Sequence, residues 1–238
     1  MTDTAQLKRL FSDGYDSGNV LSRLPNRTRR NEERLIGGSY RRLFVKAVLP
    51  HLRRDSTVVE LGPGRGSWTR ALLRSVPEGR VHVLDYHDVA EWLHPEAYDG
   101  RLVCHHVEDN SFAAVPDGAF DFFFSFGVLC HNTKAAIGEI MRNALPKMRP
   151  GAVAVHQYGD WEKLERLGWE DDRHGVPVAH RGLPDEHEWQ FWPENNPRQM
   201  SAVCADAGWN VEEPDLGLFA RDSVIRLRAP GGSGGAAQ

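Results

Sequence analysis

The run VVELGPGRGSW at residues 58–68 constrains the fold of this chain more than any other stretch. Val58, Val59 and Leu61 have the apolar and mostly β-branched character of a buried parallel strand. The glycines and proline that follow cannot continue a strand, and Ser67 then offers a hydroxyl to the free amides of a helix. A strand, a glycine-rich turn and a helix N-terminus therefore follow in order, an arrangement that attracts carboxylates and phosphates.

The spacing of the glycines separates two classes of α/β cofactor site. The dinucleotide fingerprint GxGxxG requires its third glycine at the position that Ser67 occupies. Glu60 before the turn and Pro63 inside it are also foreign to that fingerprint. The pattern ExGxGxG over residues 60–66 instead resembles motif I of the class I S-adenosylmethionine-dependent methyltransferases.

Two further expected strands fit this resemblance. The second strand, residues 81–85, ends in Asp85, where a carboxylate can accept hydrogen bonds from both hydroxyls of a ribose. The third strand, residues 102–107, is followed by Asp109, and Asp121 comes twelve residues later in an FD pair. In the family, an adenine-contacting Asp precedes the FD pair by about this interval.

The remaining strands follow at the expected places. The fourth, residues 121–127, is densely apolar, as suits a strand buried on both faces, and it runs into GVLCH, which looks like motif IV and a helix start. The fifth covers residues 152–156. A helix is expected at residues 200–207, with strands at 209–211 and 223–227. The resemblance thus covers roughly residues 48–228.

The resemblance implies an α/β fold with a Rossmann-like sheet. We expect a mostly parallel sheet of seven strands, one of them antiparallel, with helices on both faces. The expected organisation is a helical lid at residues 1–55, a methyltransferase domain at 56–228 and a flexible, glycine-rich tail at 229–238. An insertion at about 160–194 is expected to cover the acceptor.

Composition sets the class of protein. The chain has 238 residues, 40% of them apolar and 26% charged, which suits one soluble domain. No apolar run approaches the ~18 residues of a membrane helix, and the start lacks a signal-peptide core, so we expect a cytoplasmic protein without a membrane partner. Three widely separated cysteines predict reduced core thiols and argue against a clustered iron–sulfur site.

The net charge of -4 is unevenly distributed. Residues 1–55 hold twelve Lys or Arg against six Asp or Glu. This pattern favours amphipathic lid helices with solvated arginines, while a phosphate or nucleic-acid surface is the alternative. The acidic remainder of the chain argues against nucleic acid, because such binding needs a continuous basic surface.

The segment 160–194 is acidic and rich in tryptophan. It holds ten Asp or Glu against four Lys or Arg, and four of the seven tryptophans. Indole faces attract cations, and carboxylates accept hydrogen bonds from OH and NH groups, so the composition favours a cationic, hydroxyl-rich acceptor such as an aminosugar or aminocyclitol. The alternative is a solvated insertion whose tryptophans pack on the domain.

The resemblance assigns S-adenosyl-L-methionine as the cofactor and S-adenosyl-L-homocysteine as its product. Glu60 is expected to face the amino group, the glycine turn the methionine part, Asp85 the ribose, and Asp109 with Asn110 the adenine. The full set of expected cofactor residues is Glu60, Gly62, Gly64, Gly66, Asp85, Tyr86, Asp109, Asn110, Ser125 and, from the lid, Tyr40.

Catalysis requires at most one base. His131 and His156 stand near the ends of the fourth and fifth strands and have suitable side chains, though either could be an ordinary hydrogen-bonded histidine. The expected acceptor-binding residues are Tyr158, Asp160, Trp161, Trp189 and Trp192. A metal held by the two histidines and Asp160 is conceivable, but nothing in their spacing requires one, and we expect none.

We expect methyl transfer to an oxygen or nitrogen of a small molecule, such as a sugar, aminosugar or aminocyclitol of natural-product or antibiotic biosynthesis. The alternatives are an RNA methyltransferase, a nucleotide- or sulfonium-binding module without catalysis, and a nicotinamide-dependent oxidoreductase. The oligomeric state stays open, with a homodimer as one alternative.

Overall fold

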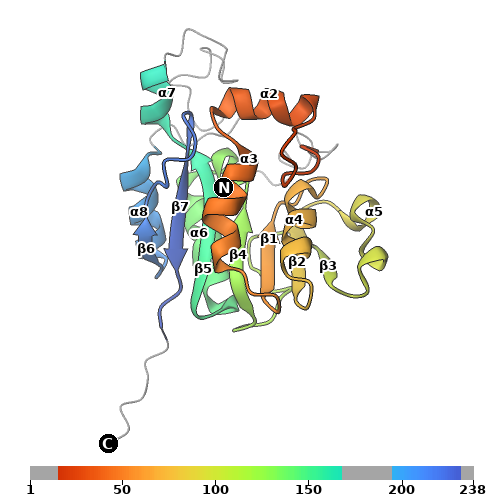
Figure 1. The fold of residues 1–238 in the computed structure, drawn as a ribbon. Helices are drawn as coiled ribbons and strands as arrows, with labels where there is room; N and C mark the ends of the chain where they lie inside the picture. The colour runs from red at the N-terminus through yellow and green to blue at the C-terminus, as the bar shows by residue number, and fades with distance from the viewer. Residues whose placement is uncertain (1–15, 168–194, 232–238) are drawn as a thin grey trace, which may run out of the picture.

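The computed structural model describes residues 16–167 and 195–231, in which a sheet lies between two layers of helices (Figure 1). The seven strands lie in the order β3-β2-β1-β4-β5-β7-β6. Strands β1 to β5 pair in parallel, whereas β7 runs antiparallel to both of its neighbours. The strands are β1 Thr57–Leu61, β2 Arg80–Asp85, β3 Leu102–His106, β4 Phe120–Ser125, β5 Met148–Gly159, β6 Asn210–Glu213 and β7 Asp222–Arg228. The expected Rossmann-like sheet is therefore confirmed.

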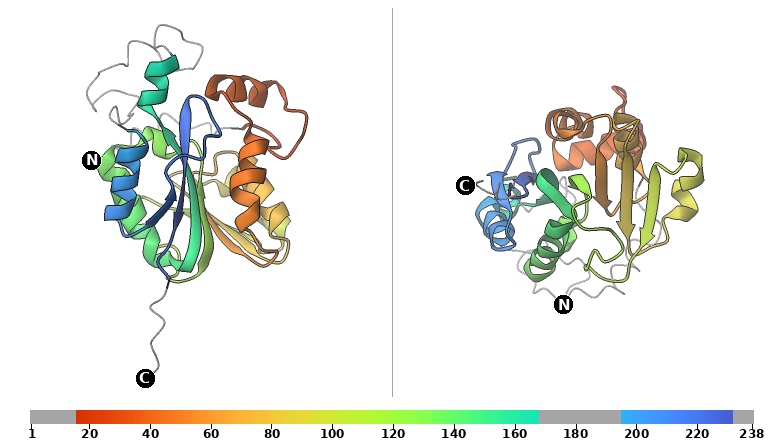
Figure 2. Two further views of the ribbon diagram at one scale, coloured as in Figure 1. Left: turned by 60° about the vertical axis from the view of Figure 1, so that its left-hand side comes forward. Right: turned by 90° about the horizontal axis from the view of Figure 1, so that it is seen from below.

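Helices connect the strands and cover both faces of the sheet, as the view from below shows (Figure 2). The α-helices are α2 Arg27–Ile36, α3 Tyr40–Leu43, α4 Ser67–Ser75, α5 Ala90–Leu93, α6 Lys134–Ala144, α7 Trp161–Leu167 and α8 Pro197–Asp206. A π-helical stretch, η1 Phe44–Val48, extends α3, and short 3-10 turns are η2 Leu49–His51, η3 Pro95–Tyr98, η4 Leu129–His131 and η5 Leu145–Lys147.

Alternate side chains of the central strands enter two separate hydrophobic cores. In β4, Phe122 and Phe124 pack with α3, η1 and α4 on one face, whereas Phe123 packs with α6 and α8 on the other. Each of these three rings is at most 1% exposed. Burial on both faces explains why the strand is apolar at nearly every position instead of at alternate ones.

The predicted strands are confirmed, but β5 extends further than expected. Residues 157–159 continue the strand because they pair with residues 222–224 of β7. This extension carries polar residues to the end of the sheet where the parallel strands finish.

One local prediction is wrong. Ser67 does not cap α4, whose N-cap is Gly66 without a side-chain hydrogen bond. Instead, the Ser67 hydroxyl accepts a hydrogen bond from the Ser17 amide at 2.8 Å and donates one to Asp16 Oδ1 at 3.1 Å. The hydroxyl therefore fastens the N-terminal segment to the glycine turn.

The N-terminal segment divides into two parts. Helix α2 lies above the carboxyl ends of the parallel strands (Figure 1), with Asn26 as its N-cap and Gly37, at φ 73°, as its C-cap. The following α3 and η1 instead pack in the core of one face, where Leu43 and Phe44 are fully buried. Leu49, at the end of the segment, is 42% exposed.

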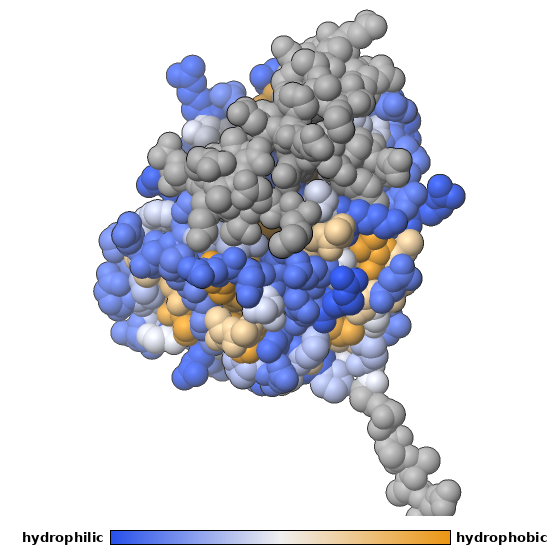
Figure 3. Space-filling view, turned by 180° about the vertical axis from the view of Figure 1, so that it is seen from behind, coloured by the Kyte–Doolittle hydropathy of each residue, from blue (hydrophilic) through white to orange (hydrophobic). Residues whose placement is uncertain are grey.

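The outer surface seen from behind is mostly hydrophilic, with small scattered hydrophobic areas (Figure 3). No helix among the described residues is long and apolar enough to cross a membrane. The three cysteines carry free thiols, and Cys130 and Cys204 are buried. Because the outer surface is mostly hydrophilic, the apolar sides of the helices are the ones that pack against the sheet.

Candidate active site

The order of the strands has a switch point at the carboxyl ends of β1 and β4, where the topology predicts a ligand-binding crevice. From β1 the chain moves outward through β2 and β3, and then returns to β4 on the other side of β1. Ligands of open α/β sheets bind at such a switch point. Here the glycine turn meets the loop after β4, since a Cβ on Gly62 would collide with Val128 Cγ2. Only glycine fits that contact.

The glycine turn has the backbone shape that the sequence pattern requires. Gly62, Gly64 and Gly66 have φ values of 68°, 52° and 80°, in the left-handed region that side chains disfavour. The Gly66 amide donates to the Pro63 carbonyl at 2.9 Å, and the Trp92 indole donates to the Gly64 carbonyl at 2.8 Å. These hydrogen bonds hold the turn in this shape, and protein side chains pack closely against Gly62 and Gly66.

Glu60 lies directly before this turn. Its side chain is 1% exposed, and its Oε2 has no hydrogen-bond partner. Burial raises the pKa of Glu60 to about 8, although Thr69 and the positive charge of Arg70 oppose this shift. A buried carboxylate oxygen without a donor is costly, so the site suits a cationic group that supplies one.

The expected ribose and adenine residues gather at the ends of β2 and β3. Burial raises the pKa of Asp85, while the His87 amide, which donates to Asp85 Oδ1 at 2.9 Å, opposes that shift. The Tyr86 hydroxyl donates to Asn110 Oδ1 at 2.7 Å, which joins the two strand ends. Asp109 is exposed, and hydrogen bonds from the Ser111 hydroxyl and from the Ser111 amide lower its pKa.

Ser125 and His156 form a pair inside the sheet. Ser125 Oγ lies 2.8 Å from His156 Nδ1, and both side chains are fully buried. Burial lowers the pKa of His156 to about 3, so the imidazole stays neutral, and its Nε2 has no partner. The ring packs against Phe123 at 4.4 Å, on the α6 and α8 face. This geometry favours a positioning role for His156 over direct proton transfer.

His131 stands in a different environment, at the end of η4. It is partly exposed and belongs to the loop that leaves the carboxyl end of β4. Burial of the ring and the positive charge of Arg221 lower its pKa to about 4, and Asp222 opposes this shift. The imidazole is therefore neutral near pH ~7 and can accept a proton.

A polar network that sequence reasoning missed lies beside His131. The Gly127 amide donates to Gln157 Oε1 at 2.8 Å, and Gln157 Nε2 donates to Asp222 Oδ2. Arg221 donates two hydrogen bonds to the same carboxylate, of 2.6 and 2.8 Å. Two features of the sequence could have indicated this network. Gln157 interrupts an otherwise apolar strand, and the pair Arg221 and Asp222 stands at the start of the last strand.

The residues that we expected to bind the acceptor lie in different parts of the structure. Tyr158 is buried on the α6 and α8 face, where its hydroxyl donates to the Pro214 carbonyl at 2.7 Å. Asp160 is buried, accepts from the Ser223 hydroxyl at 2.7 Å and caps the start of α7. Trp161 follows it and is 9% exposed. Trp189 and Trp192 lie outside the described residues.

The N-terminal segment is fastened over the crevice at several points. Arg70 forms an ion pair with Asp16 at 3.4 Å, next to the Ser67 contacts. The Tyr40 ring packs against Trp68, with centroids 5.3 Å apart, and against Phe126, at 4.8 Å. Phe126 directly follows β4, so Tyr40 joins the lid to both loops of the crevice.

Within the described ranges, no group of three or more His, Cys, Asp or Glu residues could hold a metal ion. His131, His156 and Asp160 therefore do not converge as such a group.

Comparison with known proteins places the chain in a family. The methyltransferase-domain family matches residues 28–213. A search of curated proteins gives no match.

Among solved structures, an S-adenosylmethionine-dependent methyltransferase from Aquifex aeolicus is 13% identical, with a TM-score of 0.59, over 96% of this chain and 100% of that one. The methyltransferase SibL is 16% identical, with a TM-score of 0.56, over 79% of this chain. Mitomycin 7-O-methyltransferase is 19% identical, with a TM-score of 0.55, over 76%. This chain spans about half of the latter two proteins, 53% and 52%.

The chain therefore belongs to the methyltransferase-domain family, and it shares its fold with solved S-adenosylmethionine-dependent methyltransferases. Two features of the site fit S-adenosylmethionine, namely the unpartnered oxygen of the buried Glu60 and the carboxylate of Asp85. We expect Glu60 to hold the ammonium group and Asp85 the ribose hydroxyls.

The buried Glu60 yields a prediction in which stability and binding change in opposite directions. The pKa of Glu60 is about 4.5 in the unfolded chain and about 8 in the folded protein. Between these two pH values the folded state therefore binds one proton more than the unfolded state. Its contribution to stability is therefore fully present below 4.5 and is lost as the pH rises through about 8. Glu60→Gln should raise the melting temperature at high pH and weaken S-adenosylhomocysteine binding about tenfold. Thermal melts over a pH series and calorimetry measure both, and a lower melting temperature with unchanged affinity would contradict the assignment.

Proposed function

We propose that this enzyme transfers a methyl group to an oxygen or nitrogen of a small molecule, most plausibly a sugar, aminosugar or aminocyclitol of natural-product metabolism. When bound, the cofactor supplies an electrophilic methyl group on a charged sulfonium. The residues of the chain then have to hold the acceptor at attack distance and keep water out.

The closed lid is the observation that carries this proposal. Helix α2 lies above the carboxyl ends of the strands (Figure 1). The segment before it, at residues 16 and 17, is bonded to Arg70 and Ser67 of α4, and the end of the helix is bonded to the loop before β7 through two backbone hydrogen bonds. In those bonds, the amides of Ala220 and Arg221 donate to the Gly37 and Ile36 carbonyls at 3.1 Å. A crevice covered in this way encloses a small acceptor better than a polymer. Mitomycin 7-O-methyltransferase, which shares the fold, also supports the proposal.

His131 is our choice for the base. An oxygen acceptor must lose its proton, and the neutral imidazole of His131 lies partly exposed at the end of the crevice. His156 shares the neutral state, but its Nδ1 is engaged by Ser125 inside the sheet. We therefore expect His156 to stabilise the end of β4 through its contact with Ser125.

The direct test follows the methyl label from the cofactor. Purified enzyme and labelled S-adenosylmethionine are incubated with fractions of small polar metabolites, with aminosugars, and separately with total RNA. Label should enter a small molecule, and RNA should stay unlabelled. Label that enters only RNA would overturn the proposal.

RNA methylation stays the second candidate because of one observation. The outer side of the lid carries exposed arginines, among them Arg23, Arg27, Arg30 and Arg34. Arginines next to a methyl-transfer site could contact phosphates. The labelling experiment decides between the two acceptors.

We also place the enzyme in the cytoplasm, which the free state of its three thiols supports. Light scattering would show whether it is a monomer or the homodimer that the sequence left open.

A further inference from the structure

Glu32 is a buried carboxylate on the inward side of the lid. Its side chain is 6% exposed, and neither of its oxygens has a hydrogen-bond partner. It shares the buried side of α2 with Arg29 and Ile36, which stand one turn away on either side. A buried carboxylate with no donor is unfavourable by several kcal/mol, so a purely structural lid has no reason to place one there.

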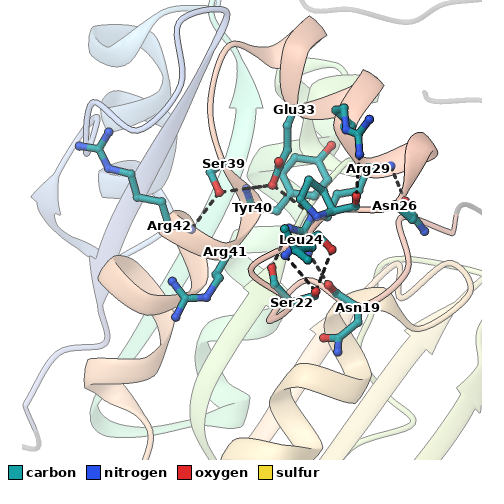
Figure 4. Close-up of polar contacts among 12 residues, drawn as sticks. Asn19, Ser22, Leu24, Asn26, Arg29, Glu33, Ser39, Tyr40, Arg41 and Arg42 are labelled. Carbon is teal, nitrogen blue, oxygen red and sulfur yellow. Dashed lines mark hydrogen bonds and ion pairs between the residues drawn. The ribbon is translucent and has the colours of Figure 1, made fainter.

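The charged neighbour of Glu32 on the lid is already engaged. Arg29 donates to the carbonyls of Asn19 and Ser22 and forms an ion pair with Glu33 at 3.2 Å (Figure 4). Glu33 in turn accepts from the Tyr40 amide at 2.8 Å. Arg29 and Glu33 thus stabilise the lid through these contacts, and Glu32 makes none of them.

The lid segment is bonded to the rest of the domain on both sides of Glu32. On one side of it, residues 16 and 17 are bonded to the start of α4, beside the glycine turn. On the other side, Ile36 and Gly37 are bonded to the loop that leads to Arg221. Glu32 lies between these points and shares the buried side of α2 with Ile36, which belongs to the hydrophobic core below the helix. Because α2 lies above the carboxyl ends of the parallel strands (Figure 1), we infer that Glu32 is on the side of the helix turned toward them.

We propose that Glu32 binds the acceptor, and that it selects an acceptor with a protonated amine. This inference rests on the proposed small-molecule function. A carboxylate with two free oxygens forms charge-assisted hydrogen bonds to an ammonium group, and it binds a neutral hydroxyl less strongly. We expect Glu60 to hold the ammonium group of the cofactor, so the site would have one carboxylate for each of the two cations.

The first test needs no knowledge of the acceptor. Glu32→Gln is compared with wild type in thermal melts without acceptor, and Asp206→Asn, at an exposed acid of α8, is the control for loss of one charge. Removal of an unpaired buried charge should raise the melting temperature, while the control should leave it nearly unchanged. A clear loss of stability in Glu32→Gln would mean that the carboxylate holds the lid, and would overturn the proposal.

The second test uses matched probes. Binding of glucosamine and of glucose to the enzyme loaded with S-adenosylhomocysteine is measured by ligand-observed NMR. Wild type should prefer the amine, and Glu32→Gln should lose about tenfold of that preference while it keeps its affinity for S-adenosylhomocysteine. No preference for glucosamine in wild type, or equal losses for both sugars, would overturn the role of Glu32. The labelling experiment above tests the small-molecule function independently, so failure of one proposal is distinguishable from failure of the other.

Discussion

Asp85→Ala is expected to weaken binding of S-adenosylhomocysteine by about 100-fold, because two charge-assisted hydrogen bonds to the ribose are lost together. The carboxylate stands at the end of β2, beside the glycine turn, and the His87 amide fixes its orientation. No other carboxylate is at this strand end, since Asp88 is exposed and caps the Ala90 amide. Isothermal titration calorimetry measures the affinity directly.

The control for this change lies in the same loop. Asp88→Asn removes one charge nearby and should leave the affinity for S-adenosylhomocysteine almost unchanged. Circular dichroism shows whether both variants are folded. If Asp85→Ala binds as tightly as wild type, the ribose is not held by β2 and the assignment of the adenosine half of the site is wrong.

His131→Ala is expected to lower kcat by about 100-fold and to leave cofactor affinity unchanged, because a general base acts only in the chemical step. The pKa of about 4 for His131 means that its neutral form dominates near pH ~7, so activity should not rise when the pH is raised further. The measurement is single-turnover transfer from labelled cofactor, with the acceptor that the labelling experiment identifies.

His156→Ala is the matched comparison. The Ser125 contact and full burial of His156 predict a loss of stability on truncation, with a smaller effect on the rate once the variant is saturated with cofactor. A full loss of turnover in a stable His156→Ala, together with an active His131→Ala, would exchange the two roles.

Strands and the cofactor turn were predictable from the sequence because their causes are local. The apolar run of β4 reflects burial on both faces, and the glycines after Leu61 reflect backbone angles that side chains disfavour. Each of these causes acts within a few neighbouring residues. The patterns therefore indicated both the sheet and the place of the crevice.

The polar network was not predictable because its partners are distant in sequence. Gln157 and Asp222 meet only when β5 and β7 pair, and Ser67 turns to Ser17 because the N-terminal segment folds back over the turn. The acidic side chain of Glu32 looks like one of many solvated charges in an arginine-rich helix. Its burial emerges only when α2 is fastened at both ends.

A crystal structure of the enzyme with S-adenosylhomocysteine tests the central claim most directly. The account predicts the amino-acid end of the ligand in the turn after β1, with its nitrogen on Glu60 and its ribose on Asp85. Density for the ligand anywhere other than this turn, or a nitrogen that makes no contact with Glu60, would contradict it.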